Sequence, residues 1–124
     1  MQNNTNELFK ICKLEHYGGL ISAVLDINKD SDIFNGHFPG QPVIPGACML
    51  QIVKEVLESA LTSSFRLKKA DHLKFILFID PSITHSVLMD LSYKQVNEDT
   101  LNVTAKLING EVICFKFQGI FIKQ

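Results

Sequence analysis

Three prolines and three glycines fall within one short segment that leads directly into an apolar stretch. Residues 36–46 read Gly-His-Phe-Pro-Gly-Gln-Pro-Val-Ile-Pro-Gly. Proline fixes φ and removes a backbone donor, whereas glycine permits tight or left-handed conformations, so this segment predicts a rigid loop. The loop holds one ionisable side chain, His37, in a defined place. We therefore expect the loop to be a functional site.

Residues 47–61 follow the loop and predict the one long helix of the chain. They combine good helix formers with apolar side chains at helical spacing on one face. The rest of the chain reads as strand-like runs, at residues 9–15, 20–27, 70–79, 86–96, 101–108 and 112–122. Gly18-Gly19 and Asn109-Gly110 are hairpin signals, the second being the stronger. This order predicts an α+β domain in which a strongly curved antiparallel sheet covers the apolar face of the helix.

Length and composition fit one globular domain over residues 1–124. Hydrophobic residues make up 46% of the 124 residues, which is enough for one core. The polar residues 1–7 are expected to be flexible. Twelve Lys and Arg nearly balance 13 Asp and Glu without a long run of either sign, so the charge pattern of a nucleic-acid binder is missing.

The cysteines and the apolar segments indicate a reduced, cytoplasmic protein. Cys12, Cys48 and Cys114 are odd in number and lack Cys-x-x-Cys or Cys/His spacing, which argues against disulfides and a metal site. The N-terminus shows no signal-peptide core. Residues 33–53 carry no charge, but three prolines prevent a continuous helix across a membrane, so no membrane association is expected.

The loop resembles the H-F-P-G-x-P-x-x-P-G signature of the 3-hydroxyacyl-acyl-carrier-protein dehydratases of bacterial fatty-acid synthesis and related pathways. Residues 66–75 with Asp80-Pro81 extend the likeness more weakly. The resemblance implies a hot-dog fold, a lyase activity that removes water from a (3R)-hydroxyacyl thioester to give the trans-2-enoyl thioester, and sites shared across a dimer. It implies no cofactor, because the acyl group arrives on the phosphopantetheine of acyl carrier protein.

The same resemblance assigns the site residues. His37 corresponds to the family's catalytic histidine, and the family spacing places Gln51 where the family has Glu or Asp. Phe38, Pro45 and Ala47 would lie against the substrate.

The chemistry requires a base, a donor for the developing oxyanion and an acid for the departing hydroxyl. A neutral imidazole is available near pH 7, which suits His37 as the base. Gly46 opens the predicted helix, where unpaired amides and the positive end of the dipole point outward, so its N–H is the candidate oxyanion donor. Gln51 cannot supply the acid, because an amide has no titratable proton near pH 7.

Glu55 lies one helical turn beyond Gln51, on the same face. The family usually has Gln at this later position, so the pair looks reversed. Three interpretations follow. Glu55 supplies the proton, directly or through a water; Gln51 orients the hydroxyl while His37 both removes and returns the proton; or the carboxylate is lost and the chain is an acyl-binding pseudo-dehydratase or a heterodimer partner. The first two describe an active enzyme, which the loop favours.

A hot-dog acyl thioesterase is the competing enzyme class, because such enzymes activate water with an acidic residue on the same helix. The expected partners are acyl carrier protein and a second copy in a homodimer, or an active dehydratase in a heterodimer. Lys68, Lys69 and Lys74 are weak candidates for docking the acidic carrier protein.

Overall fold

The computed structural model describes residues 7–36 and 43–124. Six strands and two helices follow each other along the chain: β1 Phe9–Tyr17, β2 Leu20–Ile27, α1 Ile33–Gly36, α2 Gly46–Leu61, β3 Phe65–Phe75, β4 Ser86–Gln95, β5 Thr100–Asn109 and β6 Val112–Lys123. The predicted long helix is confirmed and begins one residue earlier than expected. The short helix α1 was not predicted from the sequence.

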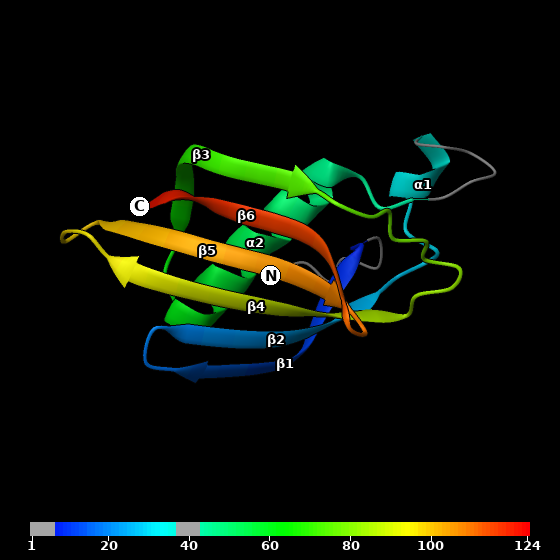
Figure 1. Ribbon diagram of the computed structural model, residues 1–124, viewed down its shortest axis with the longest axis horizontal. Helices are drawn as coiled ribbons and strands as arrows, with labels where there is room; N and C mark the ends of the chain where they lie inside the picture. The colour runs from blue at the N-terminus through cyan, green and yellow to red at the C-terminus, as the bar shows by residue number, and fades with distance from the viewer. Residues whose placement is uncertain (1–6, 37–42) are drawn as a thin grey trace.

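All six strands form one antiparallel sheet in the order β1-β2-β4-β5-β6-β3. The helix α2 crosses one face of this sheet, and α1 lies beyond one end of it (Figure 1). β1 and β3 are therefore the two edge strands. The expected α+β arrangement, a single antiparallel sheet around one long helix, is confirmed.

The core lies between α2 and the sheet. The helix buries Met49, Ile52, Val53, Val56 and Leu57, which recur at helical spacing. Strands β2, β4, β5 and β6 alternate buried and more exposed residues, so every second side chain packs toward the helix. The remaining side chains of these strands form an outer face that points away from α2.

Two hairpins differ in detail from their prediction. The first strand was predicted to end at residue 15, but it continues to Tyr17, which pairs with Leu20 and leaves Gly18-Gly19 as a two-residue connection. In the second hairpin, Asn109 pairs with Val112, so the turn is made by Gly110 and Glu111. Gly18 and Gly110 have φ of 61° and 67°, a region that favours glycine.

The strand predicted at residues 70–79 is misplaced, because β3 begins at Phe65 and ends at Phe75. The cause lies at its start, where the backbone N–H of Phe65 donates to Glu58 Oε2 at 2.7 Å. This bond joins the last turns of α2 to β3 and starts the strand soon after the helix. Beyond Phe75, the N–H groups of Ile76 and Leu77 donate to the carbonyl of Cys114, outside the regular ladder.

Candidate functional site

The first turn of α2 leaves amide groups free of helical bonds, as expected for the oxyanion donor. Pro45 is the N-cap, with φ −63° and ψ 145°, and it provides no side-chain cap. The first helical bonds run from the N–H groups of Cys48 and Met49 to the Pro45 carbonyl, at 3.0 and 3.4 Å. The N–H groups of Gly46 and Ala47 precede these bonds and lie at the positive end of the helix dipole.

The aromatic ring of Phe75 covers Gly46. A Cβ built on Gly46 would lie 2.7 Å from two carbon atoms of this ring, which is closer than any ordinary contact. Phe75 also stacks on Phe115, with ring centroids 5.2 Å apart, although 51% of Phe75 stays exposed in the single chain. Phe75 is therefore not a core residue of the single chain. A side chain at position 46 would therefore force the Phe75 ring to move.

Gln51 and Glu55 face one cavity of about 300 Å³ beside the N-terminal half of α2. The cavity is lined on its other sides by the residues around the start of β1 and by the segment between β2 and α1. Its lining consists of Glu7, Leu8, Phe9, Ser31, Ile33, Ala47, Cys48, Gln51, Ile52 and Glu55. The predicted common face of Gln51 and Glu55 is thus confirmed, and it contributes polar groups to a largely apolar cavity.

Burial raises the pKa of the Glu55 carboxyl above its ordinary value. The charges of Glu7 and Glu58 add to this increase of the pKa, whereas a hydrogen bond from Gln51 and the charge of Lys54 oppose it. A carboxyl group that resists ionisation keeps its proton to a higher pH than a free glutamate does. Glu55 is therefore not a fully solvated helix residue, because its side chain is partly buried.

Cys48 lines the same cavity, and the pKa of its thiol is also shifted. Burial, followed by the negative charge of Glu55, raises the pKa of its thiol. A thiol that stays protonated is a poor nucleophile. The arrangement therefore offers an acid, Glu55, and an amide, Gln51, rather than a thiolate.

The structure brings together part of the predicted site. Gly46, Ala47, Gln51 and Glu55 lie along the first turns of α2, with Pro45 immediately before them. His37 and Phe38 lie outside the described residues, so their geometry relative to these groups stays a prediction.

Sequence reasoning missed the contribution of Ser31. Its side chain is buried, lines the cavity and accepts a hydrogen bond from the N–H of Ile33 at 3.3 Å, at the start of α1. A serine just before an apolar pair is a helix N-terminal signal that the sequence did contain.

The three lysines proposed for docking lie on β3 and are exposed. Lys69 is paired with Asp71 at 3.0 Å, whereas Lys68 and Lys74 have no carboxylate within ion-pair distance among the residues that the structure describes. Within residues 7–36 and 43–124, no helix is long and apolar enough to cross a membrane. The same part of the chain contains no group of three or more His, Cys, Asp or Glu side chains placed to hold a metal ion.

A family model described as ApeI-like, ApeI dehydratase, matches residues 14–116. Among curated proteins, the 3-hydroxyacyl-[acyl-carrier-protein] dehydratase FabZ of Haemophilus influenzae strain PittEE is 27% identical over 105 residues, which cover 78% of this chain and 70% of that protein. FabZ of Fusobacterium nucleatum is 22% identical over 118 residues and covers 91% of this chain and 82% of its own length.

Solved structures share the fold at low identity. A chain of the dehydratase heterocomplex ApeI:P from Xenorhabdus doucetiae superposes with a TM-score of 0.73 at 17% identity, over 92% of this chain and 97% of that chain. A phenylacetic acid degradation-related protein from Ralstonia eutropha JMP134, named as a candidate thioesterase, gives 0.64 at 14% identity, over 92% and 83%. The architecture is the hot-dog fold, and the match over residues 14–116 shows that this chain belongs to the ApeI-like dehydratase family.

Proposed function

We propose that this protein removes water from a (3R)-hydroxyacyl thioester carried by acyl carrier protein and releases the trans-2-enoyl thioester. The observation that carries the proposal is the partly buried Glu55, whose pKa is raised and which lies beside Gln51 on one cavity. This group can hold the proton that the departing hydroxyl needs, whereas Gln51 cannot. Family membership and the names of the FabZ relatives support the same reaction.

In the proposed mechanism, His37 removes the α-proton and the N–H of Gly46 stabilises the negative charge that develops on the thioester oxygen. Glu55 donates a proton to the departing hydroxyl, directly or through a water that Gln51 holds. Phe38, Pro45 and Ala47 contact the substrate. An acid with a raised pKa is suited to donation near neutral pH.

The site is proposed to form across a homodimer, in which His37 of one subunit meets Glu55 of the other. The edge strand β3 and the residues just after it expose a cluster of large apolar side chains that a second chain would cover. These are Leu73, Phe75, Ile76, Leu77 and Phe78, which are 38–84% exposed. The carrier protein, which is acidic, would dock near Lys68 on the same strand.

A catalytically impaired partner of an active dehydratase is the second candidate. Gln51 at the position of the family acid favours it, and ApeI:P is named as a heterocomplex. A thioesterase is the third candidate, because a thioesterase-named structure shares the fold and an ionised Glu55 could activate water.

Mass spectrometry of 3-hydroxyacyl-acyl-carrier-protein after incubation with the pure protein separates the three candidates. A dehydratase gives loss of one water from the intact acyl carrier protein, and His37→Ala abolishes it. A thioesterase gives free carrier protein and a hydroxy acid. An unchanged substrate contradicts both activities and indicates the impaired partner. Glu111→Gln, a change of an exposed carboxylate in the β5–β6 turn, is the control and should leave the products unchanged.

A further inference from the structure

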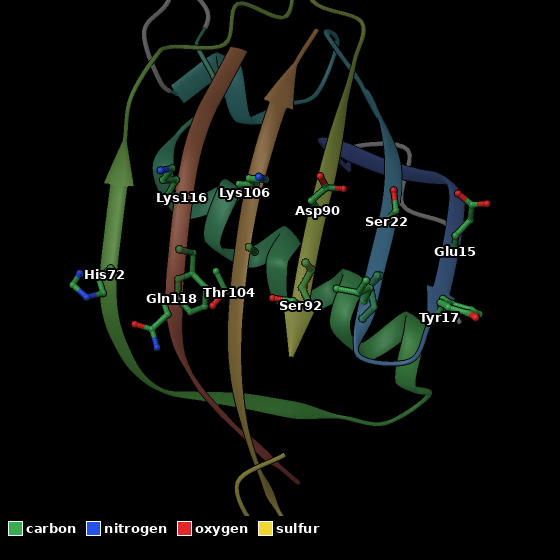
Figure 2. A pocket seen from close by; sticks show the side chains of 15 residues that line it. Glu15, Tyr17, Ser22, His72, Asp90, Ser92, Thr104, Lys106, Lys116 and Gln118 are labelled. Carbon is green, nitrogen blue, oxygen red and sulfur yellow. The ribbon is translucent and has the colours of Figure 1, made fainter. Parts of the chain in front are cut away.

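One row of side chains crosses all six strands on the outer face of the sheet and carries five of the charges on that face. The pairing register aligns one side chain from each strand in the order β3, β6, β5, β4, β2, β1. This charged row consists of Lys74, Lys116, Lys106, Asp90, Ser22 and Glu15. Figure 2 shows it from Lys116 to Glu15, with α2 behind the sheet.

The charged row divides at the middle of the sheet. Its three lysines lie on β3, β6 and β5, and its two carboxylates lie on β4 and β1. Lys69–Asp71 is the ion pair found among residues 7–36 and 43–124, so no charge of the row is paired within the described part of the chain. Within this row, the half on β3, β6 and β5 is thus positive and the half on β4, β2 and β1 is negative, whereas Lys13 on β1 and Lys94 on β4 lie on the same face outside the row.

Two rows with few charges flank the charged row. On one side lies a neutral row of His72, Gln118, Thr104, Ser92, Leu20 and Tyr17. On the other side lies an apolar row of Val24, Leu88, Ile108 and Ile113, all partly buried, which ends at Lys13 on the edge strand β1. The charged and neutral rows line a groove of about 700 Å³. The outer face is therefore hollowed and has room for side chains from a partner.

We propose that the outer face binds the outer face of a second copy of this chain, about a two-fold axis that runs parallel to the strands between β4 and β5. Such an axis exchanges the two halves of the sheet, because three strands lie on each side of it. Lys106 of one copy then faces Asp90 of the other, and the reverse contact repeats it. Lysines meet carboxylates across the interface, and no lysine of the charged row meets another lysine.

The flanking rows match under the same operation. Thr104 faces Ser92 of the second copy, and Ile108 faces Leu88 of the second copy, so polar groups meet polar groups and apolar groups meet apolar ones. Packed sheets lie about 10 Å apart with strands rotated by roughly 30°, so the central strands keep this alignment best. The pair Lys106–Asp90 is therefore the contact on which the interface depends most.

Other occupants fit the charge pattern less well. A two-fold axis perpendicular to the strands would place the lysine half over the lysine half. A uniformly acidic partner would be attracted by Lys106 and Lys116 but repelled by Asp90 and Glu15. A second copy about the proposed axis compensates both halves at once.

The molar mass in solution, measured by light scattering and by sedimentation at several protein concentrations, tests the proposal with a charge exchange. Asp90→Lys and Lys106→Asp each create two like-charge contacts by symmetry and should weaken the sheet-to-sheet association at least about tenfold, so that the mass falls toward half of the associated value at a protein concentration at least about tenfold higher than in the wild type. The double variant Asp90→Lys/Lys106→Asp restores opposite charges across the axis and should recover the wild-type mass. This decrease in mass is expected whether or not two chains also pair through the β3 edge. The result is therefore independent of the proposed active site.

Glu111→Lys and Lys29→Asp are matched controls, because they make the same charge changes at exposed residues outside the outer face and should keep the wild-type mass. Circular dichroism of each variant checks its fold. An unchanged mass in both single variants overturns the proposal, as does a double variant that fails to reassociate. Loss of binding to an acidic carrier protein by Lys106→Asp at unchanged mass also overturns it, because the face would then belong to another partner.

Discussion

Glu55 and Gln51 lie one helical turn apart on α2 and share a cavity, but they differ in burial. Glu55 is partly buried and Gln51 is exposed. Because burial is the largest cause of the raised Glu55 pKa, the position deeper along the helix is the better place for an acid. Relative to the residue order that the resemblance predicts for the family, the carboxyl group would thus be displaced along α2 without leaving the cavity.

The raised Glu55 pKa makes stability depend on pH. The folded state holds this proton more tightly than the unfolded state, so the Glu55 contribution to stability is fully present below the unfolded pKa, about 4.3, and is lost as pH rises through the raised folded value. Glu55→Gln removes this loss. The free energy of unfolding of the variant, from urea titrations, should therefore gain on the wild type as pH rises through this window. A constant difference between pH 4 and 8 would contradict the raised pKa.

Gln51→Ala tests the hydrogen bond from Gln51 that opposes the increase of the Glu55 pKa. Without this donor, the ionised form of Glu55 loses stabilisation, so its pKa should rise further than in the wild type. A titration of the carboxyl carbon by NMR measures the pKa directly. Lys94→Ala, a change of an exposed residue on the far side of the sheet, is the control. A lower Glu55 pKa in Gln51→Ala would show that the two side chains do not interact as described.

Sequence and structure agree on the helix because its pattern is local. The common face of Gln51 and Glu55 follows from helical spacing, so the sequence was sufficient to predict it. The burial of Glu55 was not predictable, because it depends on the distant residues Glu7 and Ser31, which only the fold brings beside α2. The cover of Phe75 over Gly46 is likewise a contact between elements, with no local signal.

At the scale of elements, the connection between α2 and β3 depends on one side chain. Glu58 Oε2 accepts the N–H of Phe65 at 2.7 Å, and Phe65 is 3% exposed. Sequence patterning predicted β3 too late because this contact does not follow from the local pattern. A hydrogen bond from a side chain to a backbone seven residues away carries no periodic signal.

Glu58→Ala should destabilise the protein by about 1–3 kcal/mol, because it leaves a buried backbone donor without its acceptor. Urea unfolding of the variant measures the cost. Glu111→Ala removes an exposed carboxylate in a turn and should change the free energy of unfolding by less than about 0.5 kcal/mol. Equal stabilities of the two variants would contradict a structural role for Glu58.

At the scale of the whole molecule, the β3 edge of the sheet is marked by exposed apolar side chains. The β3 edge continues into exposed apolar residues that include Leu77 and Phe78, at 51% and 84% exposure. An edge strand with such an exposed apolar patch tends to associate with another chain. A shared active site requires a second chain at this edge, where Phe75 already contacts the start of α2.

Phe78→Asp should therefore weaken the dimer and reduce turnover together, because both would depend on the same edge. Light scattering over a concentration series measures association, and the turnover assay follows on the same samples. Ile83→Asp makes the same kind of change at a residue that is 74% exposed and lies beyond this patch, and it should affect neither property. A wild type that is monomeric and active at micromolar concentration would contradict the shared site.

The most direct test of the displaced acid is the dehydration rate of 3-hydroxyacyl-acyl-carrier-protein for wild type, Glu55→Gln, Gln51→Glu and the exchanged double variant Gln51→Glu/Glu55→Gln. A positioned acid contributes about 10²–10⁴-fold, so Glu55→Gln should lose activity on that scale, and the double variant, which has the family arrangement, should regain it. Wild-type activity that persists in Glu55→Gln would contradict Glu55 as the acid. An inactive wild type that becomes active only with Gln51→Glu would show that the chain is an impaired dehydratase.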